Sequence, residues 1–165
     1  MKVNISDIAR YNGASISLHF EVAPSEVEID EGFLLDRGLS FDGTVTNTNG
    51  IMRLAGNLKA IYRNECYRCL GVVSKALELN IEESFINSPD AEQMDMYPFE
   101  GKILDINKAL NDNIILSLPM KQLCSEECKG LCNKCGANLN EMQCGCSEYD
   151  IDLRLEGLNK YLENL

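Results

Sequence analysis

The fold is decided by residues 51–85, IMRLAGNLKAIYRNECYRCLGVVSKALELNIEESF, which have the pattern of two strands joined by a short turn. Apolar and polar residues alternate on both sides of the turn, as in a half-buried strand. The apolar positions are Met52, Leu54, Leu58, Ala60 and Tyr62 before the turn and Val73, Leu77, Leu79, Ile81 and Phe85 after it. The stretch therefore predicts a long antiparallel hairpin with Cys66 and Cys69 at its tip.

Two more strands are expected before this hairpin. Residues 15–22, SISLHFEV, alternate strictly, with Ile16, Leu18, Phe20 and Val22 on one face. Residues 39–46, LSFDGTVT, form a second candidate strand, and the Asn49–Gly50 pair that follows suits a tight hairpin turn. The pattern predicts an antiparallel β meander, which could also curl into a barrel-like sheet.

Helical patterns come later in the chain. Residues 87–101 are acidic and contain two prolines, so we expect an exposed loop. The spacing of Ile106, Leu110 and Ile114 then predicts a helix over 105–117, with Asp105 as the N-cap. A terminal helix is expected to begin at Asp152, with an apolar stripe of Leu155, Leu158, Leu162 and Leu165.

The predicted fold class is α+β, with a middle helix, a C-terminal zinc-knuckle segment and a terminal helix. We expect residues 1–120 to form a β-rich domain that includes the CxxC hairpin and the helix 105–117. Residues 121–165 are expected to form a cysteine-rich zinc-binding segment with the C-terminal helix, packed with the first part as one unit.

Composition narrows the class of protein. The N-terminus lacks the pattern of a secretory signal and no run approaches about 18 apolar residues, so we expect a cytoplasmic protein without a membrane partner. The formal net charge of −11 opposes nonspecific binding to nucleic acid. Cations nevertheless gather between residues 53 and 75, where they outnumber the single Glu65 by four. These RNA-binding candidates are Arg53, Lys59, Arg63, Arg68 and Lys75.

The strand pattern places Arg53, Lys59 and Arg63 on one face of a single strand. That face can bind phosphates or can simply be solvated. Directly after the cations, residues 82–100 carry six carboxylates and no cation.

Eight cysteines in a reducing compartment indicate metal ligands before disulfides. They divide into two sets of four, the number of thiolates that a closed zinc site takes. In CNKCG, Gly136 permits the backbone conformation of a knuckle, and Gly145 lets the CxC pair bend toward one ion. Site B is therefore assigned to Cys132, Cys135, Cys144 and Cys146. Site A takes the remaining Cys66, Cys69, Cys124 and Cys128, so we expect two zinc ions per chain.

Other readings of the cysteines stay open. Cys124, Cys128, Cys132 and Cys135 could form one cage and leave Cys66 and Cys69 free. A rubredoxin-like iron site, a thiol redox switch, disulfides, or zinc with a purely structural role also fit the spacing. Enzymatic patterns are absent from the sequence: His19 is the single histidine, and there is no glycine-rich phosphate loop. No small-molecule substrate is expected.

The segments ECYRCL, CKGLC, CGANLN and CGC resemble the YceD family of bacterial proteins, named for accumulation of the large ribosomal RNA subunit. The resemblance extends from about residue 40 to the end of the chain. It differs near Leu153, where many members have proline between the equivalents of Asp152 and Arg154. It implies a cytoplasmic, non-enzymatic role in the maturation or accumulation of large-subunit (23S) ribosomal RNA.

Three functions are therefore weighed from the sequence. The leading one is a zinc-stabilised ribosome-biogenesis factor that binds ribosomal RNA or a pre-ribosomal maturation protein. The second is an adaptor whose acidic stretch, residues 82–100, docks a basic large-subunit ribosomal protein. The third is a thiolate-metal redox or electron-transfer protein.

Overall fold

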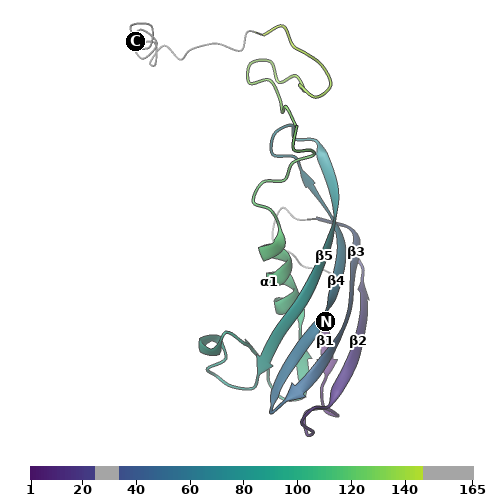
Figure 1. The fold of residues 1–165 in the computed structure, drawn as a ribbon, viewed down its shortest axis with the longest axis vertical. Helices are drawn as coiled ribbons and strands as arrows, with labels where there is room; N and C mark the ends of the chain where they lie inside the picture. The colour runs from purple at the N-terminus through teal and green to yellow at the C-terminus, as the bar shows by residue number, and fades with distance from the viewer. Residues whose placement is uncertain (25–33, 147–165) are drawn as a thin grey trace, which may run out of the picture.

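The structure, a computed structural model, describes residues 1–24 and 34–146. A five-stranded sheet with the order β2-β3-β4-β5-β6 dominates it (Figure 1). Its strands are β2 (Ser15–Val22), β3 (Leu34–Thr48), β4 (Ile51–Glu65), β5 (Val72–Ile86) and the short β6 (Tyr97–Pro98). The first four strands pair antiparallel in chain order, so the predicted meander is confirmed.

The β4–β5 hairpin is the longest continuous pairing in the described chain. Its register runs from Met52 opposite Phe85 to Glu65 opposite Val72, and the cysteine pair lies in the turn beyond. Burial alternates as the sequence predicts, with Leu54, Leu58 and Ile81 fully buried and the intervening positions largely exposed. Because both strands reach the tip, the sheet carries Cys66 and Cys69 well beyond its own core.

The strand predicted at 39–46 is longer in the structure, because β3 begins at Leu34. The register between β3 and β4 shifts between Leu35 and Leu39, which is a bulge at Asp36, Arg37 and Gly38. The bulge breaks the alternation from which the sequence prediction was made. The turn at Asn49–Gly50 is as expected, with both residues at positive φ.

A pair of glycines lets an aromatic ring lie flat on the sheet. Gly43 of β3 faces Gly56 of β4, and a Cβ atom on either would come within 2.7 Å of Phe41 Cζ. Phe41 itself is fully buried. The missing side chains are therefore a packing requirement of the core.

A second, two-stranded sheet pairs β1 (Lys2–Asn4) with β7 (Ile103–Asp105), and the sequence reading missed both strands. Helix α1 (Asn107–Ser117) follows β7 directly, two residues later than predicted. Asp105 is not the N-cap, because it still belongs to β7 and Ile106 takes the cap position. Its carboxylate nevertheless accepts the Asn107 N–H at 3.0 Å. The α1 stripe of Ile106, Leu110 and Ile114 is fully buried against the sheet.

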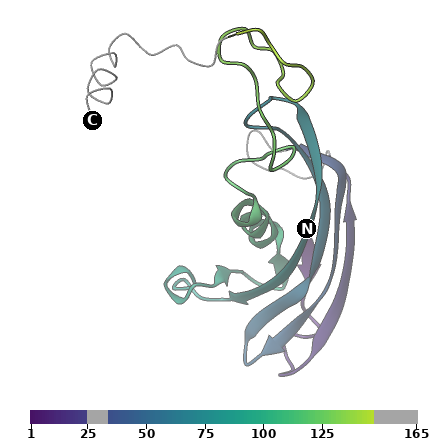
Figure 2. The ribbon, with the colours of Figure 1, turned by 45° about the horizontal axis from the view of Figure 1, so that its top comes forward.

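The acidic segment 87–101 contains two short regular elements, whereas the sequence predicts an exposed loop throughout. It contains the 3-10 helix η2 (Glu92–Met94) and β6, which pairs parallel with the end of β5. Ala91 is buried, and the Tyr97 ring lies 5.3 Å from that of Phe85. Apolar anchors at Ala91 and Tyr97 therefore hold a segment whose charge and prolines suggested a loop. It projects on the side of the sheet that carries α1 (Figure 2).

The barrel-like alternative is not confirmed, because the sheet is open between β2 and β6. Helix α1 covers one face of the open sheet (Figures 1 and 2). The helix therefore forms the second layer of the core, which in a closed barrel would be the opposite wall of the sheet. The predicted terminal helix lies outside the described residues. Within the described part of the chain, no helix has the length and apolar character needed to cross a membrane.

Candidate metal centres

The structure gathers the eight cysteines into two groups of four. In each group the four sulfur atoms lie within 4.8 Å of one another. Site A contains Cys66, Cys69, Cys124 and Cys128, and site B contains Cys132, Cys135, Cys144 and Cys146. This is the division that the spacing predicts, and the alternative cage of residues 124–135 does not match it.

Both sites begin with the same backbone knuckle. In site A the Leu70 N–H donates to the Cys66 carbonyl at 2.9 Å, and the Cys66 N–H donates to the Gly71 carbonyl at 2.8 Å. In site B the Gly136 N–H donates to the Cys132 carbonyl at 2.9 Å, and the Cys132 N–H to the Ala137 carbonyl at 2.8 Å. Each CxxC pair is thus pre-positioned by its own turn.

Hydrogen bonds join the cysteine-rich segment to the hairpin tip. The Tyr67 N–H donates to the Gln122 carbonyl at 2.7 Å, and the Leu131 N–H donates to the Arg68 carbonyl at 3.1 Å. The Arg68 guanidinium donates to the Cys128 carbonyl at 2.8 Å. In Figure 1 the segment accordingly lies beyond the end of the β4–β5 hairpin. The hairpin tip and the cysteine-rich segment, which are far apart in the sequence, therefore form one hydrogen-bonded unit at this end of the molecule.

The sulfur positions in site A fit a tetrahedral metal ion. The Cys66 and Cys128 sulfurs are 3.8 Å apart, and the Cys69 and Cys124 sulfurs are 3.7 Å apart. A tetrahedron with metal–sulfur bonds of about 2.3 Å has an edge of about 3.8 Å. Cys66 and Cys128 are buried, so solvent reaches the site mainly from the side of the exposed Cys124. The donor set and its spacing therefore suit a four-thiolate metal ion.

The surroundings of site A favour thiolate at two positions. Burial opposes ionisation of Cys66, but backbone N–H groups of Cys69, Cys124 and Arg68 outweigh it and lower the pKa of Cys66 to about 6. Burial also acts on Cys128, whose pKa is lowered because the Asn140 side chain donates to its sulfur at 3.4 Å. Hydrogen bonding among neighbouring sulfurs contributes to the raised pKa of Cys69, to about 12, and of Cys124. A dication would remove this competition by stabilising all four thiolates.

In site B, too, the pKa of one cysteine is lowered and the pKa values of others are raised. Backbone N–H groups of Cys135 and Lys134 lower the pKa of Cys132 to about 6. The neighbouring Cys135 sulfur raises the pKa of Cys146 to about 12, and the Cys132 sulfur contributes to the raised pKa of Cys144. Cys132 is the single buried cysteine of site B, whereas site A has two, Cys66 and Cys128. Site B is therefore the more open of the two.

The five RNA-binding candidates do not form one patch. Arg53, Lys59 and Arg63 are exposed on the outer face of β4, as their parity predicts. Arg53 and Arg63 are ten positions apart, which is about 33 Å along a strand. Lys75 is paired with the buried Tyr62, and directly paired residues share one face of a sheet. Lys75 therefore lies on the other face from Arg53, Lys59 and Arg63. Arg68 lies in the knuckle, where its guanidinium binds main-chain carbonyls.

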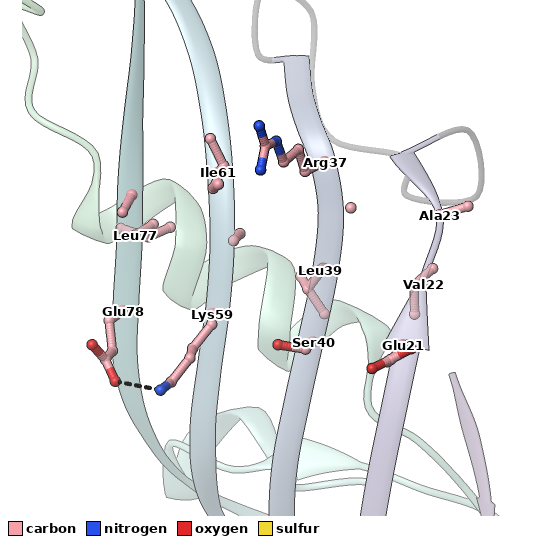
Figure 3. A pocket seen from close by; sticks show the side chains of 13 residues that line it. Glu21, Val22, Ala23, Arg37, Leu39, Ser40, Lys59, Ile61, Leu77 and Glu78 are labelled. Carbon is pink, nitrogen blue, oxygen red and sulfur yellow. Dashed lines mark ion pairs between the residues drawn. The ribbon is translucent and has the colours of Figure 1, made fainter.

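A groove of about 600 Å³ lies on the outer face near the bulge in β3 (Figure 3). Arg37 and Lys59 reach into it, and Lys59 is paired with Glu78 at 3.1 Å. Glu21 contributes a second carboxylate to the lining. Sequence reasoning missed Arg37, because the bulge that places it beside Ile61 leaves no periodic signal. With both charge signs present, the groove does not select an anion.

His19 is an exposed residue on β2. Its Nδ1 lies 2.5 Å from an Asp42 carboxylate oxygen, and this hydrogen bond raises the pKa of the imidazole above 6.5. Nothing in the described residues pairs this histidine with a nucleophile. It is therefore part of a polar strand face.

Fold and sites together define an α+β protein whose long hairpin carries two thiol clusters of the kind that hold a metal ion. A family model described as "Large ribosomal RNA subunit accumulation protein YceD" matches residues 54–162. The match covers both the hairpin and the cysteine-rich segment. The chain belongs to the YceD family.

Individual relatives agree with this. An uncharacterized protein of Mycobacterium tuberculosis is 29% identical over 150 residues, which cover 84% of this chain and 70% of that protein. The Arabidopsis thaliana protein named "Large ribosomal RNA subunit accumulation protein YCED homolog 1, chloroplastic" is 41% identical over 56 residues, 34% of this chain and 17% of its own. The Zea mays protein of the same name is 25% identical over 140 residues, 65% and 48% of the two chains. No solved structure matches this chain.

Proposed function

We propose that this protein is a non-enzymatic ribosome-biogenesis factor of the cytoplasm, stabilised by two zinc ions. It would support the maturation and accumulation of 23S ribosomal RNA by binding that RNA or a large-subunit maturation protein. The observation that carries the proposal is the unit formed by the hairpin tip and the cysteine-rich segment, which consists of residues that the YceD family model matches. A rigid, exposed tip is suited to binding.

Zinc is favoured by the chemistry of the sites. Four thiolates fill a tetrahedral shell, so neither site would keep an open position for substrate. Cys66, Cys69, Cys124 and Cys128 would hold one ion, and the other four cysteines the second. Elemental analysis of the native protein should give two zinc ions per chain. A coloured, iron-containing protein would instead support the electron-transfer alternative.

The function is tested by identifying the RNA that is recovered with the protein from cells. The full chain, tagged and purified from cells after cross-linking, should enrich precursors of 23S ribosomal RNA over 16S ribosomal RNA. Removal of the metal by a chelator should abolish the enrichment, because the tip would lose its cross-link. If neither 23S RNA nor a large-subunit maturation protein is recovered with the zinc-loaded protein, the proposal is wrong.

A basic-face version of RNA binding can be tested separately. Each phosphate contact should steepen the dependence of log affinity on log salt by about 0.7 to 0.9. The double variant Arg53→Glu and Arg63→Glu should then bind RNA more weakly with a shallower slope. Unchanged binding across salt concentrations would mean that this strand face is only solvated.

The adaptor function has one observation in its favour. Acidic side chains gather around Tyr97, whose hydroxyl donates to Asp112 at 3.0 Å. Burial raises the pKa of Tyr97, and the nearby charges of Glu83, Asp112 and Asp95 raise it further. Such a region could dock a basic ribosomal protein. Because Ala91 is buried and Tyr97 packs against the core, the test is charge removal rather than deletion. Asp90→Asn with Asp95→Asn should lose that partner and leave the fold intact.

A further inference from the structure

The two knuckles share their hydrogen bonds but differ at one residue. Position 70, directly after the second cysteine of site A, is leucine, whereas the equivalent position 136 in site B is glycine. Both residues have positive φ, +57° for Leu70 and +73° for Gly136. The same backbone turn is therefore made once with the residue that suits it and once with a residue that does not.

Leucine at this position is unfavourable for the knuckle. A side chain in the left-handed region costs free energy that glycine avoids, so non-glycine residues there need a compensating contact. Leu70 gains little from burial, because 60% of its surface is exposed. Neither backbone geometry nor the core explains why a large apolar side chain stands at the tip.

Leu70 is one of three exposed apolar residues in this turn. Tyr67 and Val72 are each 67% exposed, although both lie within three residues of Leu70. The Lys121 ammonium lies 5.2 Å from the centre of the Tyr67 ring. Three exposed apolar side chains within one short turn are a candidate binding surface. The knuckle hydrogen bonds fix the backbone that carries these side chains, which lowers the entropy cost of binding.

The charge near the tip is close to balanced. Arg63, Arg68, Lys75, Lys121 and Lys129 supply five cations, and the carboxylates of Glu65, Glu126 and Glu127 offset three of them. This end is therefore positive by two in a chain of net charge −11. Attraction to phosphate alone would therefore be weak here, and most of the binding free energy must come from contact with the apolar side chains.

We propose that Tyr67, Leu70 and Val72 form a contact surface for unpaired bases of RNA, with a nucleobase stacked on Tyr67 and packed against Leu70. This rests on the proposed function, of which it specifies the RNA contact. Aromatic side chains beside cations are the usual platform for unpaired bases. The major groove of an RNA duplex is too deep and narrow for side chains to read its bases, so single-stranded segments are the expected ligand.

The test measures binding of a 23S ribosomal RNA transcript, and of an oligoadenylate of about 16 nucleotides, to the zinc-loaded full chain. Tyr67→Ala should weaken binding of the oligoadenylate by about 5- to 150-fold. Leu70→Gly should weaken it about fivefold or more, while zinc content stays at two and the thermal midpoint stays equal or rises. Both variants should leave the salt slope unchanged.

Met94→Ala is the matched control, since Met94 is 52% exposed in the segment that follows the other end of β5. It should bind both RNAs like the wild type. Duplex RNA of the same length should bind more weakly than the single strand. If Tyr67→Ala and Leu70→Gly bind RNA normally, the tip assignment is wrong while the proposed function stands.

Other outcomes separate the two proposals. If the wild-type protein binds neither RNA but recovers a maturation protein from cells, the tip assignment and the RNA form of the function both fail. If the tip variants lose such a protein and keep their RNA affinity, the tip binds protein and the assignment to RNA is overturned. Retained stability in Leu70→Gly excludes unfolding as the cause of any loss.

Discussion

Site A and site B make different contributions to stability, and a matched pair of variants can separate them. Cys124 of site A and Cys135 of site B are both exposed, so a change to serine at either position creates no buried cavity. Each variant removes one sulfur from one cluster. Both should lower the zinc content from two ions to one per chain.

The two variants should differ in stability because the two ions close loops of different length. Site A joins Cys69 to Cys124 with 54 residues between them, whereas site B joins Cys135 to Cys144 with 8 between them. The entropy cost of loop closure grows as about (3/2)RT ln n, so loss of site A should cost about 1.7 kcal/mol more than loss of site B. For a chain of this size, the added fall in thermal midpoint is about 3–7 °C.

The assay is thermal unfolding followed by circular dichroism, with zinc content measured on the same samples. Cys124→Ser should melt below Cys135→Ser, and both below the wild type. Addition of a chelator should remove most of the difference between them, because the free thiols no longer cross-link the chain. Equal midpoints for the two zinc-loaded variants, or two zinc ions retained in either, would refute the reasoning.

Three further predictions concern single side chains. Gly56→Ala should destabilise the fold by about 1–3 kcal/mol in urea titrations, because its Cβ would lie 2.5 Å from the Asp42 carbonyl oxygen; a change below 0.5 kcal/mol would contradict the packing described. Asn140→Ala should weaken zinc binding at site A by about 10- to 100-fold in chelator competition, since Asn140 donates to the Cys128 sulfur and accepts the Lys129 N–H. The comparison is Asn133→Ala, an exposed position in the site B turn. His19, the single histidine, should titrate above 6.5 by NMR and return to about 6.5 in Asp42→Asn. Because its pKa is raised in the folded state, its stabilising contact is fully present below pH 6.5 and is lost as pH rises through the folded-state pKa; identical titrations in the two proteins would exclude the Asp42 contact.

Local signals in the sequence were enough for the main elements. Alternation located β2, β4 and β5, because one face of each strand packs on the core and the other meets water. The helical spacing of Ile106, Leu110 and Ile114 located α1 for the same reason. The cysteine spacing favoured the grouping that the structure shows, since each CxxC turn can supply two ligands and each cage needs four, but it left a cage of residues 124–135 open.

Long-range pairing escaped the sequence reading. The strands β1 and β7 are three residues each, too short for alternation to be visible, and only their pairing across the chain defines them. The same holds for β6, which Tyr97 and Phe85 bring to the sheet. The bulge at Arg37 and the split of the cations between two faces also depend on register, which a slip of one residue would invert.

The sequence by itself thus determined the hairpin, the helix and the close cysteine pairs, because each depends on spacing along a short stretch of chain. Only the tertiary structure decided how those pieces meet. It left the sheet open beneath α1 and joined Arg68 to the carbonyl of Cys128. It also placed Leu70 in a left-handed, exposed position at the tip. Backbone dihedrals and contacts between distant residues are set by packing, which no local pattern encodes.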